Sequence, residues 1–129
     1  MCIRDSTWPD PGLQQLAAAF PRGAHQPVVL GLTARAAGLG PLDAAHVAAY
    51  ESVGGPATAT VRLLGLDPFE ASGVLARLAP ELDSVAARAA EAAHQALRDG
   101  TEALPAASSP LLEIAAEAHA GWPVRLFAS

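Results

Sequence analysis

Histidine is the side chain here that could bind a metal ion or move a proton near neutral pH. The sequence contains four, which are His25, His46, His94 and His119. They are dispersed over different segments, and no two of them form the HxxxH or HExxH pairs that place two zinc ligands on one helix face. The single cysteine is Cys2, so the remainder of the chain offers no thiolate ligand or nucleophile. We therefore predict no metal site and no cofactor.

Glycines and carboxylates give no stronger catalytic signal. The stretches Gly38-Leu39-Gly40 and Gly54-Gly55 lack the preceding strand and the following Lys-Ser/Thr of a nucleotide-binding loop, and they are better explained as helix terminators. The carboxylates considered for acid-base chemistry lie at predicted helix ends or on a polar face, and they are Asp67, Asp83, Glu91 and Asp99. No nucleophile, base and orienting group can be assembled from these residues. The sequence predicts a protein that is not an enzyme.

Two features have the chemistry of a protein-binding site instead. Arg62 stands within an apolar helical stretch, where a charge needs either an internal carboxylate or a surface that another protein covers. Both alternatives remain open from the sequence. Beyond the last predicted helix, the tail carries apolar anchors and a guanidinium that are typical of interfaces, namely Trp122, Arg125, Leu126 and Phe127. The alternative for the tail is that it folds back onto its own domain.

Composition sets the class of fold that must position these residues. Hydrophobic residues make up 51% of the chain and aromatic residues only 5%, because much of the apolar content is alanine. Alanine favours helix and buries little area, so we expect closely packed helices around a thin core. The formal charge is -5 with no basic cluster, which argues against a nucleic-acid partner. No apolar run approaches the roughly 18 residues of a membrane span, so we expect a soluble, all-α domain.

The apolar spacing and the proline positions predict a bundle of about six to seven helices. The predicted helices cover residues 13–20, 27–37, 42–53, 68–78, 80–98 and 110–119, with a further helical stretch at 57–66. Gly54, Gly55 and Pro56 are expected to kink or break the chain, because two glycines and a proline disfavour a helix interior. A new helix is expected to begin at Pro80. The helix at 27–37 has little polar surface and is predicted to be central.

One predicted stripe contains a histidine. Residues recurring at three and four positions are expected to form a buried helix face, and they are Leu42, Ala45, His46, Ala49, Tyr50 and Val53. A histidine on an apolar stripe is more often a hydrogen-bonded structural residue than a metal ligand. We therefore predict a structural role for His46.

Two stretches of the sequence resemble a known protein family. The sequence AYESVGGPATATVRLLGLDP, followed at the chain end by RLFAS, resembles the carboxyl-terminal half of the UreF family of urease accessory proteins. Ala59, Val61, Arg62 and Leu63 stand in the place of the family's Ala-x-Arg-Leu stretch, and the tail ends in Arg-Leu-Phe as the family's tail does. The similarity runs from about Trp8 to Ser129. The order, separation and position of the two motifs make the match specific.

The resemblance implies an all-helical, non-enzymatic, cytoplasmic protein of the nickel-urease maturation machinery. Such proteins bind the accessory protein UreD, also called UreH, and recruit the GTPase UreG so that nickel is loaded into the urease apoprotein. The family commonly dimerises, so a homodimer is also expected. The family often carries His-Glu near the tail, and here Ala120 follows His119, which removes that charge. The expected partner-binding residues are Arg62, His119, Trp122, Arg125, Leu126 and Phe127.

Two other classes remain open from the sequence. One is a generic helical interaction module of another family. The other is the carboxyl-terminal regulatory domain of a transcription factor, since acidic, alanine-rich helical bundles occur there. Co-purification with UreD distinguishes the first from a urease accessory protein, and a basic helix-turn-helix in the upstream reading frame would indicate the second.

The first six residues, Met1 to Ser6, have a separate explanation. The string MCIRDS matches the translation of a transposase mosaic end used in sequencing-library adapters. We expect residues 1–6 to be an artefact and exclude them from the fold argument. Residues 7–129 are then expected to form the carboxyl-terminal part of a single helical domain.

Overall fold

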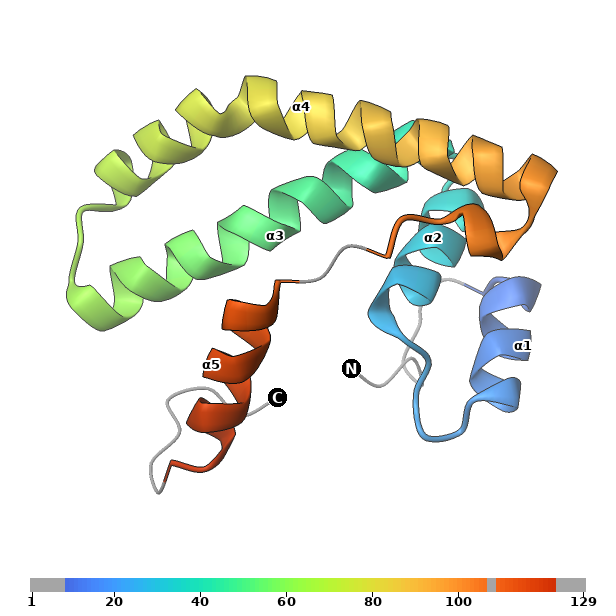
Figure 1. The fold of residues 1–129 in the computed structure, drawn as a ribbon, viewed down its shortest axis with the longest axis horizontal. Helices are drawn as coiled ribbons and strands as arrows, with labels where there is room; N and C mark the ends of the chain where they lie inside the picture. Colours follow the sequence, from blue (N-terminus) through green and yellow to red (C-terminus); the bar gives the residue numbers. More distant parts are fainter. Residues whose placement is uncertain (1–8, 107–108, 123–129) are drawn as a thin grey trace.

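The computed structural model describes residues 9–106 and 109–122, and this part of the chain is α-helical without any strand (Figure 1). The elements are α1 (Pro11–Ala19), α2 (Gln26–Ala36), α3 (Pro41–Leu64), α4 (Pro68–Asp99), the short 3-10 helix η2 (Thr101–Ala103) and α5 (Pro110–Ala120). The predicted all-α class is confirmed. The described residues form five α-helices in place of the expected six to seven.

The lower helix number arises because two predicted breaks do not occur. Pro56 lies inside α3 and Pro80 lies inside α4, and both helices are continuous through their proline. An interior proline removes one hydrogen bond and costs about 3 kcal/mol in an isolated helix. Here α3 and α4 pack against each other more extensively than any other pair of elements, and α4 curves over α3 (Figure 1). We infer that this packing outweighs the local cost.

The core is thin and made mainly of alanine, as the composition predicts. The buried apolar residues are Leu13, Leu16, Ala34, Ala49, Ala86 and Ala90. The expected stripe on α3 is buried only in part, because α4 is the one helix that packs extensively against α3. Ala49 is buried and His46 half-buried, whereas Leu42 and Tyr50 are exposed. The prediction that residues 27–37 are central is wrong, since α2 buries only Ala34.

Local capping explains where two of the helices begin. The Asp10 carboxylate accepts a hydrogen bond from the Leu13 backbone N–H at 3.0 Å and starts α1. Asp43 Oδ2 accepts one from the Gly40 N–H at 2.8 Å and supports the start of α3.

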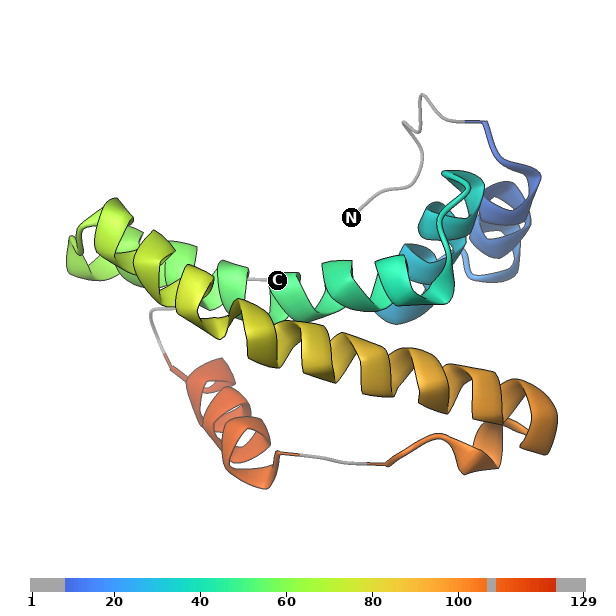
Figure 2. The ribbon, with the colours of Figure 1, turned by 90° about the horizontal axis from the view of Figure 1, so that it is seen from above.

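Helix α1 packs on α2, and α2 packs on α3. Helix α5 makes no substantial contact with another described element and lies apart from the α3–α4 pair (Figure 2).

This arrangement leaves much of the chain open to solvent. The accessible surface is 10144 Å² for a mass of 13.1 kDa. A compact monomer of that mass is expected to expose about 6,400 Å². Several large apolar side chains on α3, α4 and α5 are therefore available for contact with another surface.

Candidate protein-interaction surface

An open, shallow groove runs along the carboxyl-terminal half of α3, and Gln26 at the start of α2 borders it. Its volume is about 570 Å³. We call it the α3 groove, and it is lined by Gln26, Tyr50, Glu51, Gly54, Gly55, Thr58, Ala59 and Arg62. The lining combines an acidic, a basic and a phenolic side chain over a floor of small residues. These are groups suited to contact with a protein surface.

The continuity of α3 is what places the charged groups on one face. Glu51, Gly55, Thr58 and Arg62 recur at intervals of four, three and four residues, and such positions lie above one another on a helix. Eleven residues at about 1.5 Å per residue separate the two charged positions by about 16 Å. Gln26 Nε2 donates a hydrogen bond of 3.1 Å to Glu51 Oε2, which ties α2 to one end of the groove.

The floor of the groove is flat because of its glycines. A Cβ atom added at Gly55 would meet nothing within 4 Å, so this position faces open space. At Gly54 the added atom would lie 3.4 Å from the Tyr50 ring, so the tyrosine packs over the first glycine. Small residues allow another backbone to approach a helix closely. The floor therefore leaves room for an approaching chain between Glu51 and Arg62.

Arg62 is exposed, in contrast to its expected position within an apolar surface. The ion pairs among the described residues are His46–Asp83 and Arg98–Glu91, and neither includes Arg62. The alternative of an internal salt bridge is thus not supported. Leu63 and Leu64, its neighbours, are exposed as well. Arg62 lies where a partner surface could reach it.

His46 links the two long helices. Its Nε2 atom lies 3.4 Å from Asp83 Oδ1 on α4, and the two side chains are 42% and 72% exposed. A contact between two such exposed groups contributes little to stability. His46 is thus less buried than its predicted stripe implies, and its structural role stays a prediction.

The predicted tail residues lie partly within the described part of the chain. His119 and Trp122 are at the end of α5, where their rings meet edge to face with centroids 5.2 Å apart and an interplanar angle of 62°. Because α5 makes no substantial contact with α3, the structure does not bring these two residues to Arg62. Arg125, Leu126 and Phe127 lie outside the described residues.

Sequence reasoning missed several lining residues of the α3 groove, among them Gln26, Tyr50 and Glu51. Tyr50 was assigned to a buried stripe, and Glu51 received no role. The signal was the eleven-residue interval between Glu51 and Arg62, which indicates a common face only if the helix continues through Pro56. The predicted break concealed that relation.

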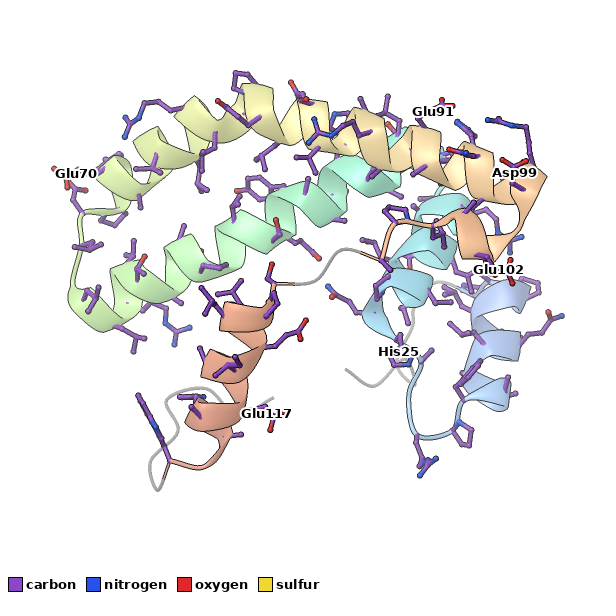
Figure 3. The ribbon with its side chains drawn as sticks, viewed as in Figure 1. His25, Glu70, Glu91, Asp99, Glu102 and Glu117 are labelled. Carbon is purple, nitrogen blue, oxygen red and sulfur yellow. The ribbon has the colours of Figure 1, made fainter. Side chains whose placement is uncertain are left out.

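Ionisable side chains elsewhere are scattered. Figure 3 shows Glu70 near one end of α4, Glu91 and Asp99 toward its other end, Glu102 in η2, Glu117 on α5 and His25 just before α2. Within residues 9–106 and 109–122, no three His, Cys, Asp or Glu side chains gather into a group that could hold a metal ion. None of the described helices is long and apolar enough to cross a membrane.

Comparison with known proteins gives a consistent family assignment. The UreF family model matches residues 2–79, which is more than half of the chain. A urease accessory protein UreF of Mycobacterium sp. (strain JLS) is 39% identical over 112 residues, covering 86% of this chain and 47% of the relative. The UreF of Mycolicibacterium vanbaalenii is 34% identical over 122 residues, covering 95% of this chain and 50% of the relative.

A urease accessory protein UreF of Mycobacterium tuberculosis is 34% identical over 112 residues, covering 87% of this chain and 46% of the relative. This chain thus spans about half the length of the curated relatives that it matches. No solved structure matches it significantly. The family model, the relatives and the all-helical fold agree, and the chain belongs to the UreF family of urease accessory proteins.

Proposed function

We propose that this chain takes part in the nickel-dependent maturation of urease as a non-enzymatic adaptor in the cytoplasm. In this role it binds UreD (UreH) and recruits the GTPase UreG to the urease apoprotein, and nickel is the cargo that the assembly delivers. The proposal rests on membership of the UreF family. Family membership also displaces the two alternatives that the sequence left open, a module of another family and a transcription factor domain.

The observation that carries the adaptor role is the α3 groove. It is open, lies on a continuous helix and presents Arg62 without a described ion-pair partner. An exposed guanidinium beside a small-residue floor can form a bidentate contact with a carboxylate of a partner. We propose that Arg62 makes such a contact with UreD or UreG.

Co-purification tests this proposal directly. Tagged chain is co-expressed with UreD and UreG, and the captured partners are quantified for the parent, Arg62→Glu and the matched control Arg77→Glu. Arg77 is also an exposed arginine, on α4 and outside the groove. We expect charge reversal at Arg62 to reduce capture of one partner at least tenfold and reversal at Arg77 to leave it within about twofold. Equal capture by both variants would exclude Arg62 from the contact.

The chain end is proposed as a second contact. Trp122 is 60% exposed, and a large exposed aromatic side chain is a typical interface anchor. Together with His119, Arg125, Leu126 and Phe127, it is proposed to contact UreD. Deletion of residues 122–129 should abolish UreD capture while the melting temperature stays within about 2 °C of the parent. A deletion that unfolds the protein would instead indicate a tail that covers its own domain.

A homodimer is also proposed, and it would occupy the α3 groove in place of the UreD or UreG contact rather than together with it. Two copies of α3 packed antiparallel across their glycine floors would place Glu51 of each copy opposite Arg62 of the other, because a two-fold interface is self-complementary. Arg62→Glu alone should therefore weaken self-association, and Glu51→Arg with Arg62→Glu should restore it. Sedimentation equilibrium measures the dimer constant. Failure of the double variant to recover would refute this arrangement while leaving the UreD and UreG contacts open.

A further inference from the structure

The turn between α3 and α4 exposes a compact set of large apolar side chains. We call it the tip cluster, and it consists of Leu63, Leu64, Leu66 and Phe69, which are 46%, 69%, 47% and 86% exposed. The tip cluster lies at the end of the α3–α4 pair that is remote from α1 and α2 (Figure 1). It leaves on the order of 400 Å² of apolar surface in water, which is the size of the largest apolar patch on a typical monomer, and such patches are often functional.

The backbone of the turn between α3 and α4 is held by two helix caps, although the side chains of the tip cluster are exposed to solvent. Gly65 ends α3 with φ +64°, a left-handed conformation that glycine adopts without steric cost. Asp67 then starts α4, and its Oδ1 accepts a hydrogen bond of 2.8 Å from the Phe69 N–H. These two caps hold Phe69 on the outer side of the turn. The tip cluster is therefore a formed surface rather than a collapsed loop.

The composition and charge of this surface distinguish between possible occupants. The tip cluster contains three leucines and one phenylalanine, which are residue types that are most often buried inside a folded domain. If two copies met tip to tip, the four carboxylates of Asp67 and Glu70 would outnumber the two nearby guanidinium groups of Arg62, so like charges would dominate. This charge pattern disfavours a second copy as the occupant.

The chain covers only 47% of the length of the UreF from Mycobacterium sp. (strain JLS), and its accessible surface greatly exceeds that of a compact monomer. We propose that the tip cluster is an intramolecular packing surface, covered in a longer polypeptide by the half of the family sequence that this chain does not match. The tip cluster is then unavailable to urease partners. This inference rests on family membership, and it does not depend on the proposed contacts with UreD or UreG.

Cysteine accessibility tests the proposal. In a Cys2→Ser background, Phe69→Cys is introduced into the chain and into a chimaera with the unmatched half of the Mycobacterium sp. relative. That half is joined ahead of residue 7, because the chain is expected to correspond to the carboxyl-terminal part of the family domain. Rates of reaction with a maleimide are compared, with Arg88→Cys on the exposed polar face of α4 as the control. We expect the Phe69→Cys thiol to react at least tenfold more slowly in the chimaera. The control should react within about twofold of its rate in the chain alone.

Two results would overturn the proposal. One is an equal reaction rate for the Phe69→Cys thiol in the chain and in a chimaera whose circular dichroism spectrum shows that it is folded and helical. The other is protection in the chain alone that grows with its concentration, which would identify a second copy as the occupant. If the chimaera does not reach native helical content, the two segments are co-expressed as separate polypeptides, and the same tenfold protection is expected. None of these measurements uses a urease partner, so a negative UreD capture experiment leaves their interpretation unchanged.

Discussion

Enlarging Ala86 tests whether close contact between α3 and α4 holds the fold together. Ala86 lies on α4 with 0% exposure, and the other buried residues of the pair, Ala49 and Ala90, are also alanines. Ala86→Leu adds three carbon atoms at a contact between two helices that meet through small side chains. Extra carbon atoms in a well-packed contact typically cost about 1–3 kcal/mol. For a chain of this length, that loss corresponds to a decrease of about 4–12 °C in the melting temperature.

The matched control is Ala87→Leu, because Ala87 is the next residue of α4 and is exposed. Leucine and alanine have similar helix propensities, so the control carries the same small intrinsic cost without the steric one. Urea unfolding followed by circular dichroism gives the free energy of unfolding for the parent and both variants. We expect the control to lie within about 0.5 kcal/mol of the parent. If Ala86→Leu and Ala87→Leu differ by less than that, the two helices are not held by close contact at Ala86.

Three further substitutions test the helix ends and the interior proline. Asp67→Ala removes the side-chain cap on the Phe69 N–H and should lower the free energy of unfolding by about 1 kcal/mol in urea titrations; an unchanged midpoint would show that water replaces the cap. Gly65→Ala should cost about 1–2 kcal/mol, because φ is +64° while the added Cβ meets no atom within 4 Å, so the whole effect comes from the backbone. Pro80→Ala restores a donor to the Ala76 carbonyl and should raise the melting temperature by at least 4 °C. A lower melting temperature would instead mean that the packing of α4 requires the proline.

The individual helix starts were predictable because they depend on neighbouring residues. Asp67-Pro68 combines a capping carboxylate with a first-turn proline, and the structure has α4 begin at Pro68. Pro41 and Pro110 likewise occupy the first positions of α3 and α5. Each of these three signals acts over only a few residues and agrees with the fold, whereas the similar signal at Pro80 predicted a helix start that α4 does not have.

Burial was harder to predict, because periodicity defines a face without showing what covers it. The predicted stripe on α3 contains both the buried Ala49 and the exposed Tyr50. Alanine can be buried by one neighbouring helix at close range, whereas a larger side chain needs cover from several directions. The described fold provides that cover at few positions. The candidate groove was missed for a related reason, since it depends on α3 continuing through Pro56.

The amino-acid sequence by itself determined the helical class, the capped helix starts and the family, because propensity, caps and motif order are local properties of the chain. Only the tertiary structure decided that the helix continues through Pro56 and Pro80, since the packing of α3 against α4 competes with the local cost of each proline. It also decided that Arg62 and Glu51 share an exposed groove. Exposure depends on which elements lie nearby, and that is set by contacts between residues distant in the sequence.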